Sequence, residues 1–196
     1  MPLKSNVSRR MTLLPAVEAW RSSFGAAFPA GFLCRASLPE RWLRIHSLPE
    51  SKRYPETDAE QSELLTRQNA AADYALGESA NCILFITRFG DSKRWSSSDE
   101  LPLSGLTPEH VLSCEEGEDH VQFFALNLVW RTGSFDELIL AAAEDRTGPL
   151  MFANTVNRSA YAPYDGGADL FFPTSVAVGV ARRRFSEWLS KREDGL

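Results

Sequence analysis

The 196-residue sequence is poor in the residues that build metal centres and disulfide frameworks. Its three cysteines and three histidines are Cys34, Cys82, Cys114, His46, His110 and His120. The cysteines form no C-x-x-C pair, and an odd, scattered set is typical of reduced thiols in a cytosolic protein. The histidines lack the H-x-x-x-H and H-E-x-x-H spacings of zinc sites. We therefore expect a cytoplasmic protein with no metal site and no cofactor.

Long apolar runs are also absent. No stretch approaches the roughly 18 apolar residues that span a membrane. Residues 8–14 superficially resemble a twin-arginine export signal, but Pro15, Glu18 and Arg21 interrupt the apolar segment that such a signal needs. The sequence thus predicts neither membrane insertion nor export. We expect a flexible N-terminal leader over residues 1–11 and a single globular domain over residues 12–196.

The chain has fewer basic than acidic residues. The chain has 21 Lys and Arg residues against 26 Asp and Glu residues, which gives a formal net charge of −5. Because a nucleic-acid-binding surface must neutralise phosphates, this balance disfavours a nucleic-acid partner. A protein partner would need complementary, basic charge.

Helical and strand-like segments alternate along the chain. Capping-box patterns, S/T-x-x-E, predict helices over 57–76 and 134–145, with N-caps at Thr57 and Ser134. Apolar residues at helical spacing predict two further helices, over 12–28 and 174–192. Six segments are typical of strands: 41–48, 82–86, 110–114, 120–130, 150–153 and 168–172. Paired strands flank two turns, so we predict an α+β fold: a single mixed or mainly antiparallel sheet of about five or six strands with helices packed on it.

The stretch R-I-H-S-L-P-E-S-K-R-Y-P-E, residues 44–56, is the first candidate site. Its candidate ligand-binding residues are His46, Glu50, Lys52, Arg53 and Tyr54. The amides at the start of the following helix attract anions, and Lys52 and Arg53 would add charge-assisted hydrogen bonds. His46, near the strand end, has the chemistry of an acid or base near neutral pH. The alternative is a strand-to-helix turn whose charged residues are merely solvated.

The stretch Y-A-P-Y-D-G-G-A-D, residues 161–169, is the second candidate site and contributes Asp165 and Asp169. Asp-Gly-Gly between apolar runs predicts a hairpin, because glycines supply positive φ without a Cβ penalty. Asp169 begins an apolar strand, where a carboxylate is costly unless it is paired. An internal ion pair with a buried Arg or Lys, a ligand site and a metal site all remain open for it. The metal is the weakest of these, because D-x-x-x-D lacks the calcium-loop pattern.

No catalytic signature accompanies these candidates. The sequence has no G-x-x-x-x-G-K-S/T phosphate loop, no G-x-S-x-G elbow and no recognisable cysteine nucleophile, so the catalytic residues are unassigned.

The motifs R-I-H-S-L-P-E-S-K-R-Y and Y-D-G-G-A-D, with the closing Trp188-Leu189-Ser190, resemble a family of uncharacterised bacterial proteins of the domain-of-unknown-function type. The resemblance covers roughly residues 41–192 and implies no activity or catalytic residue. Relatives near polymorphic toxin or Rhs-type loci would imply an immunity or accessory role.

Two functions therefore stay open. The first is a small non-catalytic protein-interaction or ligand-binding domain, which suits an acidic chain without a cofactor fingerprint. The second is an enzyme or sensor for a small anionic ligand, a phosphate or a carboxylate. It requires the segments 44–54 and 164–169 to converge on one pocket.

Overall fold

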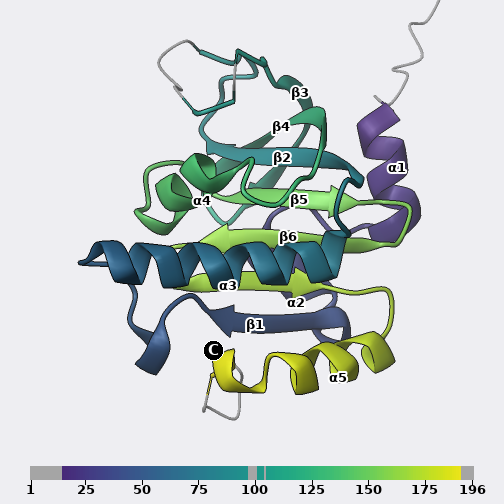
Figure 1. The fold of residues 1–196 in the computed structure, drawn as a ribbon. Coiled ribbons are helices and arrows are strands. Elements are labelled where there is room, and N and C mark those ends of the chain that lie inside the picture. Colours follow the sequence, from purple (N-terminus) through teal and green to yellow (C-terminus); the bar gives the residue numbers. More distant parts are fainter. Residues whose placement is uncertain (1–14, 97–100, 104, 191–196) are drawn as a thin grey trace, which may run out of the picture.

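One antiparallel sheet runs through the protein (Figure 1). The structure, a computed structural model, describes residues 15–96, 101–103 and 105–190, so the leader predicted over 1–11 lies outside the described residues. The strands are β1 (Trp42–His46), β2 (Asn81–Phe89), β3 (Glu109–Glu116), β4 (Asp119–Val129), β5 (Leu150–Asn154), β6 (Ser159–Tyr164) and β7 (Gly167–Phe171). Their order is β1-β7-β6-β5-β2-β4-β3, and all neighbours are antiparallel. The α+β class and the antiparallel sheet are confirmed.

The sheet has seven strands, so the prediction of five or six was too low. The strand that the sequence pattern did not reveal is β6, S-A-Y-A-P-Y. It is alanine-rich and contains Pro163, whereas the usual strand signal is a run of β-branched and aromatic residues. Proline is tolerated because the pairing of β5 with β6 ends at Tyr161, which leaves Pro163 with β7 as its neighbour.

Helices cover both faces of the sheet. They are α1 (Pro15–Phe24), α2 (Gly31–Ser37), α3 (Asp58–Leu76), α4 (Asp136–Ala143) and α5 (Ser175–Arg184), with short 3₁₀ turns η1 (Pro39–Arg41), η2 (Pro49–Ser51) and η3 (Ser186–Trp188). Alternate residues of each strand face opposite sides. Leu170 therefore packs in the core beneath α3, α4 and α5, whereas its neighbour Phe171 packs with α1 and α2. Figure 1 shows α3 in front of the sheet and α5 beside β1.

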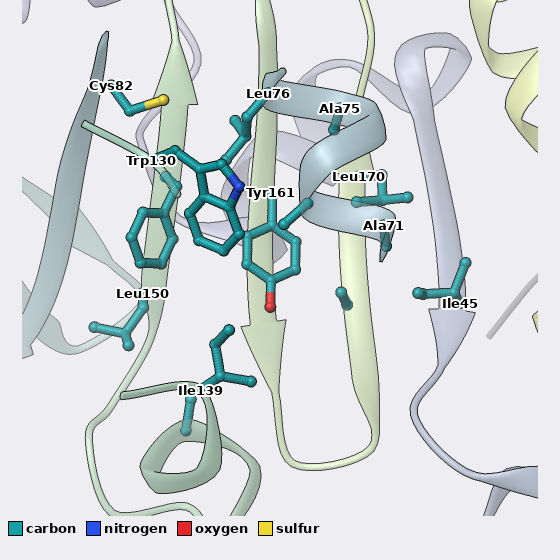
Figure 2. Close-up of a cluster of buried hydrophobic side chains, with 14 of the residues drawn as sticks. Ile45, Ala71, Ala75, Leu76, Cys82, Trp130, Ile139, Leu150, Tyr161 and Leu170 are labelled. Atoms are coloured by element: carbon teal, nitrogen blue, oxygen red, sulfur yellow. The ribbon is translucent and has the colours of Figure 1, made fainter. Parts of the chain in front are cut away.

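Buried aromatic rings fill the core under α3 and α4 (Figure 2). The rings of Trp130 and Tyr161 lie 5.8 Å apart between their centroids. The Tyr161 hydroxyl donates to Oε1 of Gln68 at 2.7 Å, and the amide of Gln68 donates to Ser47 and to the Gly167 carbonyl at 2.7 and 2.9 Å. This buried network attaches α3 to the end of β1 and the start of β7, and so fixes the edge of the sheet that carries both candidate motifs.

The helix predictions had mixed outcomes. In α3, Thr57 accepts a hydrogen bond from the Glu60 amide at 3.2 Å, which confirms the predicted N-cap. The predicted cap at Ser134 is wrong, because α4 begins at Asp136 without a side-chain cap. The long helix predicted over 174–192 ends at Arg184 and is followed by η3. Residues 31–37 form α2, a helix that the sequence analysis did not predict.

Candidate functional site

The two candidate motifs lie side by side in the sheet. Strands β1 and β7 pair antiparallel, with Arg44 opposite Asp169 and His46 opposite Gly167. The turn between β6 and β7 therefore lies next to the C-terminal end of β1. Segments 44–54 and 164–169 lie side by side, but their predicted site residues do not line one common pocket, which the anionic-ligand hypothesis required.

Asp169 forms a buried ion pair with Arg44. Asp169 is 3% exposed, and its carboxylate accepts from Nε and Nη2 of Arg44 at 2.8 and 3.1 Å. The indole Nε1 of Trp42 donates to the same carboxylate at 2.8 Å. The Arg44 guanidinium also lies 4.7 Å from the centre of the Tyr164 ring. Of the alternatives for Asp169, the structure shows the internal ion pair, and its partner Arg44 was not among the predicted site residues.

Asp165 forms a second, more exposed contact between the motifs. Its Oδ2 lies 2.8 Å from Arg53 Nε in an ion pair and accepts a hydrogen bond from the Tyr54 hydroxyl at 3.0 Å. The Arg53 side chain is 64% exposed, so water screens this pair. The hydrogen bond to Asp165 raises the pKa of Tyr54. This contact fastens the loop after β1 to the β6–β7 turn.

Lys52 points to different partners. Its Nζ lies 2.7 Å from Glu60 and 3.1 Å from Glu56, and these contacts raise its pKa. Glu60 lies in the first turn of α3, and Glu56 directly precedes the N-cap residue of this helix. Lys52 therefore stabilises the beginning of α3 and lines neither of the two hollows described below.

The hairpin predicted at Asp165-Gly166-Gly167 is present, but its physical reason differs from the one expected. Neither glycine has a positive φ. A Cβ on Gly167 would overlap the carbonyl oxygen of Ile45 on β1. Glycine is needed there because the two strands approach closely, and not for turn conformation.

A small hollow lies at the β6–β7 turn, and we call it the hairpin hollow. Its volume is about 190 Å³, and Phe32, Tyr164, Asp145 and Asp165 lie in its lining with the Arg44–Asp169 pair. Three carboxylates face one guanidinium, which disfavours an anionic ligand. It is also smaller than the roughly 300–1,000 Å³ of typical ligand pockets.

A larger hollow lies at the C-terminal end of β1, and we call it the β1 hollow. Its volume is about 440 Å³. The lining consists of His46, Leu48, Pro49, Glu50, Ser51, Arg67, Glu187, Trp188, Leu189 and Ser190. It is formed by the end of β1 with η2, by α3 and by η3 with the residues after it. Two of the predicted site residues, His46 and Glu50, are in this lining.

His46 lines the β1 hollow and carries an unpartnered ring nitrogen. Its Nε2 is fully buried and has no hydrogen-bond partner among the described residues. Burial lowers the pKa of the ring, and the positive charges of Arg44 and Arg67 lower it further, while a hydrogen bond with the Gly166 backbone acts in the opposite direction. The ring is therefore neutral at pH 7, with one protonated and one unprotonated nitrogen.

Arg67 supplies donors beside this nitrogen. The residue is 8% exposed, and its guanidinium lies 5.4 Å from the centre of the Trp188 ring. Nε donates to Glu63 at 2.6 Å. Its two Nη nitrogens donate no hydrogen bond to another described residue. A guanidinium so placed presents a pair of parallel N–H groups that fit a carboxylate.

The backbone of η2 is strained where it borders the β1 hollow. Glu50 and Ser51 have φ values of 57° and 59°, a left-handed conformation that costs a non-glycine residue roughly 1–3 kcal/mol. Two such residues in succession hold the Glu50 side chain at the border of the hollow. Strain of this kind tends to cluster at ligand-binding segments.

The sequence did not identify Arg67 and Trp188 as site residues. One signal for Arg67 was available: it lies three residues after Leu64 and four before Ala71, within the apolar side of the predicted helix. A charged residue at such a position is unusual unless it has a specific partner. Trp188 had no such signal, because its contact with Arg67 joins residues far apart in the chain.

Comparisons with known proteins identify a family. A family model described as a domain of unknown function, DUF3885, matches residues 31–193. No curated protein and no solved structure matches the chain. Within residues 15–96, 101–103 and 105–190, no group of three or more His, Cys, Asp or Glu side chains is arranged to hold a metal ion. None of the helices in these ranges is long and apolar enough to cross a membrane.

Proposed function

The chain belongs to the DUF3885 family, and we propose that it is a non-catalytic ligand-binding domain whose β1 hollow holds a small molecule by a carboxylate group. The observation that carries the proposal is the buried, unpartnered Nε2 of His46. A buried polar atom without a partner costs roughly 1–3 kcal/mol, so a ligand that supplies the missing hydrogen bond gains affinity.

Arg67 favours a ligand that carries a negatively charged group. Arg67 lines the same hollow as His46. His46 donates from Nε2 only in the Nε2–H tautomer, which gives up the hydrogen bond of its other ring nitrogen to the Gly166 backbone. A carboxylate accepts from a guanidinium and an imidazole N–H at the same time. The apolar side chains of Leu48, Trp188 and Leu189 provide walls for the body of the ligand.

A carboxylate fits the hollow better than a phosphate. Glu50 and Glu187 are exposed and also border the hollow, and they repel a ligand that carries two negative charges. The volume of about 440 Å³ lies within the range of small-molecule sites.

The proposal favours binding over catalysis because the spare polar atoms in the hollow are guanidinium donors and one imidazole nitrogen. This set is suited to holding a carboxylate in place. Acid–base catalysis by His46 would need a reacting group within hydrogen-bond reach of Nε2, and turnover of a bound carboxylate would reveal it.

Isothermal titration with hydrocinnamate and with its uncharged amide tests the proposal. We expect hydrocinnamate to bind roughly tenfold or more tightly than the amide, since a hydrogen bond to a charged group contributes about 1.5–3 kcal/mol. Arg67→Gln and His46→Gln should each weaken hydrocinnamate binding. Arg182→Gln, on the exposed side of α5, is the matched control and should leave binding unchanged.

Folding of each variant is verified by circular dichroism and thermal unfolding, because Arg67 also packs on Trp188. His46→Gln keeps the test valid if Arg67→Gln unfolds. Equal binding of hydrocinnamate and its amide, or hydrocinnamate binding that survives both substitutions, would overturn the proposal.

A further inference from the structure

The β1 hollow carries opposite charges at its floor and at its border. Arg67 is almost buried, whereas Glu50 and Glu187 are exposed. The two glutamates come from different walls, Glu50 from η2 and Glu187 from η3. A molecule in the hollow therefore meets a guanidinium at its inner end and carboxylates at its outer end.

Both border carboxylates are free to take a ligand. Neither Glu50 nor Glu187 forms an ion pair or a side-chain hydrogen bond with another described residue. Arg183 lies four residues before Glu187, a spacing that permits pairing on a helix, but the break between α5 and η3 intervenes. Glu187 thus belongs to the border of the hollow and not to a helical ion pair.

The Glu50 carboxylate is placed there by the strained turn. Glu50 (φ 57°, ψ 23°) and Ser51 (φ 59°) are two of the three residues of η2, and both have a left-handed backbone. An ordinary loop would relieve this strain, so the conformation is held by its surroundings. The buried Leu48 anchors the turn on one side.

We propose that the ligand of the β1 hollow is a zwitterion, an amino acid with an apolar body whose carboxylate lies at Arg67 and whose ammonium group faces Glu50 and Glu187. This inference rests on the proposed function and adds the second charge. Arg67 binds the carboxylate, and Glu50 and Glu187 bind the ammonium group. The carbon skeleton of the ligand packs against Leu48, Trp188 and Leu189.

Two pairs of compounds test the second charge by isothermal titration. Phenylalanine differs from hydrocinnamate by an α-ammonium group, and ε-aminocaproate differs from caproate by a terminal ammonium group. We expect the ammonium member of at least one pair to bind roughly threefold to tenfold more tightly, because its ammonium group forms solvent-exposed ion pairs with Glu50 and Glu187. This preference should disappear in the double variant Glu50→Gln/Glu187→Gln.

The matched control is Glu116→Gln/Glu118→Gln, which removes two exposed carboxylates at the β3–β4 turn, away from the hollow. It should keep the preference and so exclude an effect of net charge. Equal binding within both pairs, or a preference that survives Glu50→Gln/Glu187→Gln, overturns the zwitterion but leaves the proposed function intact if hydrocinnamate still requires Arg67. Failure of every carboxylate to bind overturns both.

Discussion

The Arg44–Asp169 pair should be a major source of stability at the edge of the sheet. Asp169→Asn keeps the size of the side chain and removes its charge. The change leaves the Arg44 guanidinium, whose side chain is 15% exposed, without a counter-ion. It also turns an amide NH₂ toward one of the Arg44 donors, because the carboxylate uses both oxygens to accept from Arg44.

The magnitude follows from the burial of the pair. Removing one partner of a buried ion pair costs roughly 3–5 kcal/mol. Because Arg44 keeps some contact with water, we expect about 3 kcal/mol, at the lower end. For a chain of this size that corresponds to a fall in Tm of roughly 6–12 °C.

Urea unfolding followed by tryptophan fluorescence measures the change, with the m-value checked for constancy. Asp165→Asn is the matched control: it lies four residues away, and its partner Arg53 is exposed, so its loss should cost less than about 1 kcal/mol. The double variant Arg44→Met/Asp169→Leu should recover much of the stability lost in Asp169→Asn. Similar losses for Asp169→Asn and Asp165→Asn would show that the buried Arg44–Asp169 pair stabilises the protein no more than the exposed pair does.

Three further predictions concern the same edge of the sheet and the overall charge. Gly167→Ala should lower the free energy of unfolding, measured with urea, by about 1–3 kcal/mol or more, because the new Cβ would overlap the Ile45 carbonyl. Gly166→Ala is the control and should be tolerated, because its Cβ would lie 3.3 Å from its nearest neighbour, the Tyr164 side chain. Burial, with Arg44 and Arg67 facing the ring, lowers the folded-state pKa of His46, so the unfolded chain protonates first and stability falls as pH drops below about 6.5. His46→Gln should lose less Tm than the parent between pH 7.5 and 5.5, and an equal loss would contradict this. A protein partner, one of the alternatives that the sequence leaves open, would have to be basic. Pull-down at low salt should then recover a basic protein that high salt releases, and capture independent of salt would argue against it.

Local signals predicted the parts of the fold that depend on neighbouring residues. The capping box at Thr57 and the Asp-Gly-Gly hairpin are patterns within a few residues, and both elements are present. Strand β6 escaped prediction because burial on both faces, and not β-branched sequence, makes it a strand. The cap at Ser134 failed because the chain first forms a turn there and begins α4 at Asp136.

The candidate site could be predicted only in part, since it is assembled from distant segments. The charged cluster after β1 was identified, but its members separate in space: His46 and Glu50 line the β1 hollow, while Lys52 joins the start of α3. Strand register decides that Arg44 lies opposite Asp169, and register is not readable from one strand alone. Arg67 reaches the hollow from a helix whose placement depends on the buried Gln68 network.

The central claim is that His46 Nε2 and Arg67 hold a carboxylate in the β1 hollow. Imidazole ¹⁵N NMR of the labelled protein during titration with hydrocinnamate tests it most directly, because the signals of His46, His110 and His120 report separately. We expect the His46 Nε2 resonance to shift in a saturable way while the resonances of His110 and His120 stay unchanged. Saturable binding of hydrocinnamate without a shift of His46 would contradict it.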